Sequence, residues 1–314
     1  MVQGEVLQQI VDNVSKCILG KRREVEWILT AMLAEGHVLL EDVPGTGKTV
    51  LIKALAKTVQ GDFHRIQCNP DLLPSDVTGV SIYHPKTESF VFKPGPVMTN
   101  ILLVDEINRA TTKTQSALLE AMEERQVSVD GELYRLPKPF IMLATQNSVD
   151  FEGTYMLPEA QLDRFMFKLS LGYPDHRTEL DMVTSQKSGH PIETLQPVTD
   201  METMVQLQRQ VYDIHMDDAV MEYAVQMVRK TREHADIKLG ASPRASLALI
   251  HASKAYAMLQ GRSYVIPDDI KDLSSYVLAH RLILHTEAIY NGQSQASVLQ
   301  SVVEQVRPPI RMEQ

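Results

Sequence analysis

The stretch EDVPGTGKTVLIKAL, residues 41–55, joins two different apolar patterns and decides the fold. Before it, HVLL (37–40) is a short continuous apolar run, which is typical of a buried strand. After it, apolar residues recur at helical spacing, at Leu51, Ala54, Leu55 and Val59. Gly45 and Gly47 are therefore expected in a tight loop between a strand and the N-terminus of a helix.

A loop of this kind collects unsatisfied backbone N–H groups around one point, and glycine lets the backbone approach a ligand without Cβ clashes. Lys48 is then placed to reach the β- and γ-phosphates of a nucleotide, and the Thr49 hydroxyl to ligate Mg²⁺. The usual pattern has glycine where this chain has Asp42, so an ordinary glycine turn before a surface lysine is the alternative. The flanking strand and helix favour a phosphate site formed by Pro44, Gly45, Thr46, Gly47, Lys48, Thr49 and Val50.

The first ~180 residues alternate short apolar runs with helical stretches. Runs without internal alternation suit strands that are buried on both faces, as in a parallel sheet covered by helices. The expected strands are HVLL (37–40), FHRIQC (63–68), ILLV (101–104), FIMLAT (140–145) and FMFKL (165–169). The expected fold class is therefore α/β, with a parallel sheet between helices. Two amphipathic helices (5–17 and 21–35) precede the first strand.

Two hairpins interrupt this alternation, and the chain changes character after about residue 190. VSVDGELYRL (127–136) contains Asp130-Gly131, a strong two-residue turn signal, and GVSIYHPKTESFVFKPGP (79–96) resembles a second hairpin. Helical periodicity then dominates without a convincing strand, at 200–213, 217–235, 243–260 and 268–288. The expected domains are a nucleotide-binding core at 1–188, with inserts near 79–96 and 126–137, and a helical domain at 196–314.

A second chemical signal is ILLVDEINRA (101–110), in which Asp105 and Glu106 follow four aliphatic residues. A buried strand delivers these carboxylates to its C-terminal edge, where the phosphate loop must also lie. Asp105 would hold Mg²⁺, and Glu106 would orient or deprotonate an attacking water. The alternative is a helix N-terminus that is rich in acids.

Two further polar residues occupy suggestive positions. Asn147 follows the strand-like FIMLAT and could position the nucleophilic water, although an asparagine after a strand is usually a turn former. In GASPRASLALI (240–250), Ser242 is a good N-cap and Pro243 suits the first helical position. Arg244 then lies in the first turn, where the helix dipole disfavours a cation unless an anion is nearby. Bound nucleotide phosphate would qualify as that anion, and a solvated surface arginine is the alternative.

Composition narrows the class of protein. The 314 residues are 44% hydrophobic and carry a net charge of −9, which argues against a chain built mainly to hold nucleic acid phosphates. Cys17 and Cys68 lack metal-ligand spacing and are expected to be reduced in a cytoplasmic protein. No apolar run approaches the roughly 20 residues needed to span a bilayer, and the N-terminal sequence is not typical of a signal peptide.

Taken together, these stretches resemble the MoxR group of AAA+ ATPases over essentially the whole chain. The resemblance is carried by EDVPGTGKT, RIQCNPDLLPSDVTG, FKPGPVMTNILLVDEINRA, LLEAMEERQVSVDG, ATQNSVDFEGTYMLPEAQLDRF and GASPRA. The family typically has proline after the asparagine, where this chain has Ser148. The resemblance implies roles by position, namely Walker A (Lys48, Thr49), Walker B (Asp105, Glu106), sensor 1 (Asn147), sensor 2 (Arg244) and an arginine finger for the next subunit (Arg164).

The same resemblance implies an ATP hydrolase that uses Mg²⁺ and forms a ring, expected to be a hexamer. It also implies chaperone-like remodelling or maturation of protein complexes, with partners that often carry a von Willebrand factor A domain. The segment ILGKR (18–22) would line the adenine pocket, and the hairpins would project toward a central pore. A DNA-associated AAA+ motor or loader is the alternative function. A GTP switch is less consistent, because no Asn-Lys-x-Asp motif for guanine is present. A small kinase is less consistent, because it would not need an all-helical domain with Arg244 or an arginine finger such as Arg164.

Overall fold

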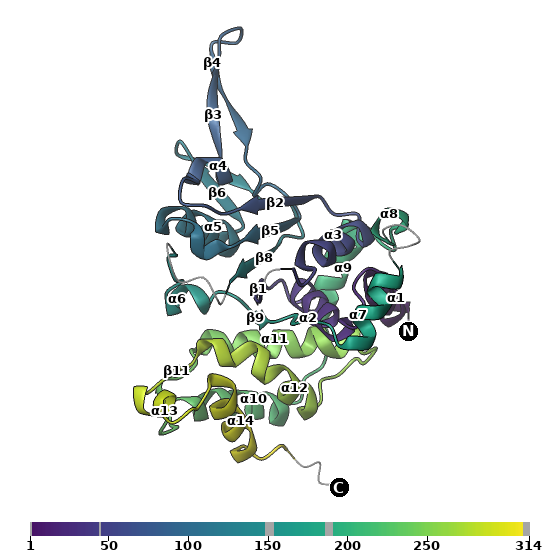
Figure 1. Cartoon of the computed structure of the whole chain (residues 1–314), viewed down its shortest axis with the longest axis vertical. Helices are drawn as coiled ribbons and strands as arrows, with labels where there is room; N and C mark the ends of the chain where they lie inside the picture. Colours follow the sequence, from purple (N-terminus) through teal and green to yellow (C-terminus); the bar gives the residue numbers. More distant parts are fainter. Residues whose placement is uncertain (1, 44, 148–153, 186–190, 310–314) are drawn as a thin grey trace.

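The computed structural model describes residues 2–43, 45–147, 154–185 and 191–309 (Figure 1). Its centre is a five-stranded parallel sheet in the order β2-β5-β8-β1-β9. The strands are β1 (Val38–Glu41), β2 (Phe63–Gln67), β5 (Ile101–Asp105), β8 (Ile141–Gln146) and β9 (Phe167–Leu169). Each corresponds to one of the five apolar runs, so the predicted α/β fold with a parallel sheet is confirmed.

Helices cover both faces of this sheet, and alternate residues of one strand face different layers. In β5, Ile101 and Leu103 pack with the helices α1 (Val2–Ser15), α2 (Arg22–Leu33) and α3 (Lys48–Thr58). Leu102 and Val104 pack on the other face with α4 (Pro74–Thr78) and α5 (Thr112–Glu124). Continuous apolar runs are needed in β1, β5 and β8 because these central strands are buried on both sides.

Strand β2 departs from the expectation of burial on both faces. It lies at the edge of the sheet, and in its sequence FHRIQ only Ile66 is buried. His64, Arg65 and Gln67 are exposed. An edge strand has a free side toward solvent and tolerates polar side chains. This position allows β2 to contribute side chains to the carboxyl edge of the sheet.

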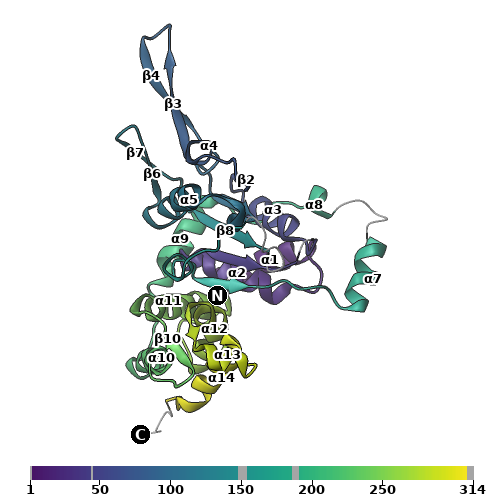
Figure 2. The ribbon, with the colours of Figure 1, turned by 60° about the vertical axis from the view of Figure 1, so that its left-hand side comes forward.

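Both predicted hairpins are present and lie beside each other. The first pairs β3 (Gly79–His84) with β4 (Ser89–Pro94), and the second pairs β6 (Gln126–Val129) with β7 (Glu132–Arg135). Asp130 and Gly131 both have positive φ, of 52° and 84°, as a primed two-residue turn requires. The Phe92 and Tyr134 rings stack at a centroid distance of 3.8 Å and join the two hairpins. The longer hairpin projects from the body of the molecule (Figure 2).

Short helices connect some of the strands and lead from the sheet to the C-terminal helices. A 3₁₀ turn (Ile107–Arg109) follows β5, and α6 (Glu159–Leu162) precedes β9. After β9 come α7 (His176–Ser185) and α8 (Pro191–Thr194), neither of which the sequence reading predicted. In the described part of the chain, no helix combines the length and apolar character that crossing a membrane requires.

The C-terminal region is a helical bundle, referred to below as the lid, which confirms the predicted helical domain. Its main helices are α9 (Met201–Val211), α10 (Asp218–Thr231), α11 (Pro243–Leu259), α12 (Pro267–Leu278), α13 (Thr286–Tyr290) and α14 (Gln295–Gln305). The prediction that this region lacks strands is wrong, because β10 (Ile237–Leu239) pairs with β11 (Ile283–Leu284).

The predicted helix over 268–288 is also too long, since α12 ends at Leu278. A 3₁₀ turn (Ala279–Arg281) follows, in which the buried side chains of His280 and Arg281 both hydrogen-bond to the carbonyl of Phe165, at 3.1 and 2.8 Å. These contacts to the core end the regular helix. Tertiary contacts therefore override the helical periodicity of the sequence.

His37 lies just before β1 and joins strand β8 of the sheet to helix α5. Its Nδ1 accepts a hydrogen bond from the Met142 backbone N–H at 3.0 Å, so its Nε2 carries the proton that is donated to the Met122 carbonyl at 3.1 Å. The ring is fully buried, and this burial lowers its pKa from 6.5 to about 3. The folded protein therefore keeps His37 neutral.

Acidification is expected to destabilise the fold through this histidine. Between pH 6.5 and 3, His37 is protonated in the unfolded chain and remains neutral in the folded chain. The stability that is present above pH 6.5 is therefore lost as the pH falls. The loss approaches about 1.4 kcal/mol per pH unit for one such group. Denaturant unfolding between pH 7.5 and 5 should show a shallower pH dependence in His37→Gln than in wild type. The exposed hairpin variant His84→Gln is the control, and equal slopes in all three proteins would contradict this assignment.

Candidate functional site

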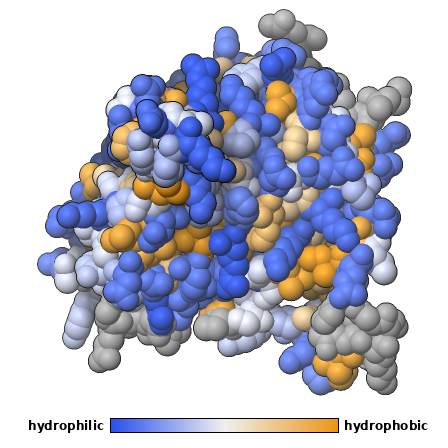
Figure 3. Space-filling model, turned by 90° about the horizontal axis from the view of Figure 1, so that it is seen from above, coloured by the Kyte–Doolittle hydropathy of each residue, from blue (hydrophilic) through white to orange (hydrophobic). Residues whose placement is uncertain are grey.

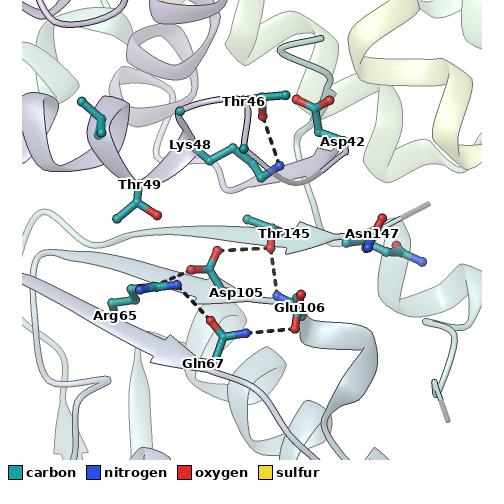
Figure 4. Close-up of a pocket in the computed structure, with 14 residues that line it drawn as sticks. Asp42, Thr46, Lys48, Thr49, Arg65, Gln67, Asp105, Glu106, Thr145 and Asn147 are labelled. Carbon is teal, nitrogen blue, oxygen red and sulfur yellow. Dashed lines mark hydrogen bonds and ion pairs between the residues drawn. The ribbon is translucent and has the colours of Figure 1, made fainter. Parts of the chain in front are cut away.

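The phosphate loop connects β1 to α3 in the expected way. Gly45 and Gly47 have φ values of 84° and 87°, in the left-handed region that favours glycine, and Gly47 caps α3. Lys48 folds back over the loop, where its Nζ donates to the Val43 carbonyl at 2.8 Å and to Thr46 Oγ1 at 3.2 Å (Figure 4). The ammonium group therefore lies over the mouth of the loop. Pro44, which was also expected here, lies outside the described residues.

Asp42 explains the departure from the usual glycine at the start of the loop. Its side chain is buried and accepts three backbone N–H groups, from Val43 at 2.9 Å, Leu171 at 2.9 Å and Gly172 at 3.1 Å. Leu171 and Gly172 follow β9, which is the neighbour of β1 in the sheet. The carboxylate therefore anchors the phosphate loop to the adjoining strand and satisfies amides that would otherwise be unpaired.

Asp105 and Glu106 lie at the carboxyl edge of the sheet, opposite the phosphate loop (Figure 4). Asp105 is buried and accepts hydrogen bonds from Arg65 Nε at 2.5 Å and from Thr145 Oγ1 at 3.2 Å. Thr145 Oγ1 also accepts the Glu106 backbone N–H at 2.8 Å. Glu106 has a φ of 56°, an unusual value for a residue with a side chain. Such strain is typical of functional sites and here turns the carboxylate at the end of β5.

Sequence reasoning missed Arg65 and Gln67, which reach this site from the edge strand β2. Gln67 Nε2 donates to Glu106 Oε2 at 2.9 Å, and Arg65 Nη2 donates to Gln67 Oε1 at 2.9 Å. Arg109 forms an ion pair with Glu106 at 3.3 Å. One signal in the sequence could have revealed them. Arg65 and Gln67 are polar and two residues apart in FHRIQC (63–68), a run that was interpreted as a wholly buried strand. These side chains fix both carboxylates from one side.

Cys68 lies directly after β2 and contributes no negative charge to this edge. Burial, and then the nearby Asp105 and Glu106 carboxylates, raise the pKa of its thiol to about 12. Cys17 and Cys68 are both free cysteines in the structure. The negative charge nearest Cys68 therefore comes from the Asp105 and Glu106 carboxylates.

The loop and the carboxylates enclose a cavity of about 230 Å³. Asn147, at the end of β8, lines it together with Asp42, Gly45, Thr46, Gly47, Lys48, Thr49, Val50, Arg65, Gln67, Asp105, Glu106, Thr145 and Gln146. Ile18 belongs to the segment that is expected at the adenine. It lies beside the loop, and its Cδ1 would be 3.5 Å from a Cβ placed on Gly47. The cavity combines N–H donors, an ammonium group and hard oxygen donors, which is chemistry suited to a polyphosphate with a divalent cation.

Arg164 and Arg244 do not line this cavity. They lie together at the boundary between the core and the lid, where both pair with Glu123 of α5, at 2.7 and 2.5 Å respectively. Ser242 occupies the N-cap position of α11 as predicted, but its hydroxyl donates to Asp163 at 2.9 Å instead of capping the helix. The anion beside Arg244 within this chain is therefore the Glu123 carboxylate.

Sequence-family models match both parts of the chain. Residues 37–167 match the model described as ATPase family associated with various cellular activities (AAA), and residues 229–302 match the AAA lid domain. A crystal structure of a "putative ATPase" from Cytophaga hutchinsonii superimposes with a TM-score of 0.92 at 38% identity, covering 98% of this chain and 96% of that one. The matched ranges contain the phosphate loop, both carboxylates and the lid helix that carries Arg244.

Three relatives match along nearly the whole chain. The Bacillus subtilis protein YeaC is 53% identical over 98% of this chain and 96% of its own length. Chaperone MoxR1 of Mycobacterium tuberculosis is 40% identical over 96% of this chain and 82% of its own length. Protein MoxR of Methylorubrum extorquens is 30% identical over 95% of this chain and 93% of its own length. On this similarity, and with the AAA core and lid both matched, the chain belongs to the MoxR family of AAA+ ATPases.

Proposed function

We propose that this chain binds ATP in the cavity between the phosphate loop and the carboxyl edge of the sheet, and hydrolyses it to ADP and phosphate. The amides of residues 45–49 and the Lys48 ammonium bind the phosphates. Glu106, held by Gln67, orients and deprotonates the attacking water, and Asn147 positions that water from the next strand. Gln67 and Arg65 act as positioning residues because they contact the carboxylates.

The residues at this site fit a magnesium ion. Thr49 and Asp105 both line the cavity and offer a hydroxyl and a carboxylate oxygen, which are the hard donors that Mg²⁺ prefers. Mg²⁺ usually binds through one or two protein ligands together with water and phosphate oxygens. The ion would neutralise charge that develops on the phosphates during hydrolysis. Arg65 and Thr145 hold Asp105 in place for this role.

We further propose that the working form is a ring, most simply a hexamer, in which neighbouring subunits share each site. The single observation that carries this proposal is the position of Arg164. Its guanidinium lies at the core–lid boundary and outside the cavity that holds Lys48 and Glu106. In this arrangement Arg164 does not reach a nucleotide in the cavity of its own chain. It can instead contact the nucleotide of a neighbouring subunit, where it would stabilise the charge of the transition state. Arg244 lies beside it and would act from the same face.

ATP hydrolysis in this ring would drive chaperone-like remodelling or maturation of protein complexes. One supporting fact is that a relative with 40% identity is named a chaperone. Another is the exposed apolar surface of the β3–β4 hairpin, where Tyr83 is 50% and Phe90 73% exposed. The face seen from the hairpin end is mostly hydrophilic, with several separate apolar patches (Figure 3). A protein with a von Willebrand factor A domain is the proposed partner class.

Mixed rings test the shared site. Arg164→Ala subunits retain the phosphate loop, and Lys48→Ala subunits retain the arginine, so each variant alone should be nearly inactive. Mixed at equal amounts, about a quarter of the interfaces combine an intact loop with an intact neighbouring arginine, because heterologous contacts join different surfaces. Phosphate release should therefore recover to about a quarter of the wild-type rate.

The control mixes Lys48→Ala subunits with subunits that carry both Lys48→Ala and Arg164→Ala. Every subunit in this mixture lacks Lys48, so no interface has an intact site. This mixture should stay inactive. Mixed rings that are verified by mass and show no recovery would contradict a site shared between subunits.

A further inference from the structure

Glu123 lies near the C-terminal end of α5 and bridges the two arginines that the proposed function assigns to a neighbour's nucleotide. Its Oε2 lies 2.7 Å from Arg164 Nη1, and its Oε1 lies 2.5 Å from Arg244 Nη2. Each carboxylate oxygen therefore serves one guanidinium group. Two guanidinium groups this close repel each other unless an anion lies between them. Glu123 supplies that anion within the isolated chain.

The backbones of the two arginines are held together by other contacts. Asp163 pairs with the buried Arg281 of the lid at 2.9 Å and accepts the Ser242 hydroxyl at 2.9 Å. Asp163 directly precedes Arg164, and Ser242 lies two residues before Arg244. The two segments thus remain joined whether or not Glu123 is charged. A change of charge at Glu123 is therefore expected to alter where the two guanidinium groups point, and not the contact between the two segments.

The surrounding cavity of about 320 Å³ has more positive than negative side chains. Its lining contains four arginines and three carboxylates, namely Arg125, Arg164, Arg244 and Arg281 with Glu35, Glu123 and Asp163. Arg125 pairs with Glu35 and Arg281 with Asp163, which leaves one carboxylate for two arginines. The side chains of Arg164 and Arg244 are 33% and 50% exposed. An anion with more charge and more oxygens than a carboxylate can therefore approach and bind both of them.

We propose that Glu123 is a placeholder for the terminal phosphate of the nucleotide on the neighbouring subunit. In the unassembled chain it keeps Arg164 and Arg244 together and offsets one of their two positive charges. On assembly the neighbour's triphosphate replaces it, because that group carries more charge and offers three oxygens. This inference rests on the shared site proposed above and makes Glu123 a positioning residue that competes with assembly.

Glu123→Gln tests the placeholder because it removes the charge and keeps the shape. ATPase rate per subunit is measured against protein concentration at low salt, together with oligomer mass in the presence of ATP. The concentration at half-maximal rate should fall about three- to tenfold relative to wild type, with the shift reduced at high salt as for other exposed charges. Glu124→Gln, which changes the same charge one residue further along α5, should leave the midpoint unchanged.

Combination with Arg164→Ala and Arg244→Ala separates this effect from a structural one. In that background, Glu123→Gln should no longer shift the assembly midpoint measured by mass. A midpoint that Glu123→Gln leaves unchanged or raises, or a shift that persists without the arginines, would overturn the placeholder. Failure of the shared site is distinguishable, because it appears as absent recovery in the mixed rings. Recovery there together with an unmoved midpoint contradicts the placeholder alone.

Discussion

Glu106→Gln is expected to bind ATP with nearly wild-type affinity and to hydrolyse it at least about a hundredfold more slowly. The amide has the shape of the carboxylate and still accepts a hydrogen bond from Gln67, so the cavity should keep its form. It cannot accept a proton from water at neutral pH, and this loss falls on the chemical step alone. Phosphate release under saturating ATP and equilibrium binding of a labelled ATP measure the two effects separately.

The matched control is Glu88→Gln, at the exposed turn between β3 and β4, which should leave both measurements unchanged. A Glu106→Gln protein that turns over ATP within a few-fold of wild type would show that another group activates the water.

Lys48→Ala is expected to weaken ATP binding by at least about thirtyfold, since truncating one member of a charged contact typically costs 2–5 kcal/mol. The lysine ammonium lies over the loop on the Val43 carbonyl and Thr46 hydroxyl, and phosphate oxygens would replace these weaker acceptors. Titration calorimetry with a slowly hydrolysed ATP analogue and Mg²⁺ gives the affinity directly.

Lys53→Ala is the appropriate control, because Lys53 is exposed on the same helix and does not line the cavity. Its affinity for the analogue should match that of wild type. An unchanged affinity in Lys48→Ala would place the phosphate site elsewhere in the molecule.

The features that the sequence predicted are those encoded locally. The central strands need apolar residues on both faces, and the phosphate loop needs glycine at Gly45 and Gly47, where φ is positive. The primed turn at Asp130 and Gly131 is local in the same sense. Strand position within the sheet is not local, so the edge location of β2 and the contacts of Arg65 and Gln67 could not be read from their run.

Long-range contacts account for the other differences. The helical pattern over 268–288 continues past Leu278, but His280 and Arg281 bond to the Phe165 carbonyl, more than a hundred residues away. The meeting of Arg164 and Arg244 on Glu123 likewise joins three distant segments. No spacing rule brings such residues together. The same holds for Asp42, whose role depends on amides that follow β9.

A structure of the assembled protein with Mg²⁺ and a non-hydrolysable ATP analogue tests the shared nucleotide site most directly. We expect the triphosphate to lie on the amides of residues 45–49, with Lys48 on its oxygens and an Arg164 guanidinium from the adjacent subunit at the terminal phosphate. A nucleotide bound away from this cavity, or one whose terminal phosphate is contacted by Arg164 of its own chain, would contradict it.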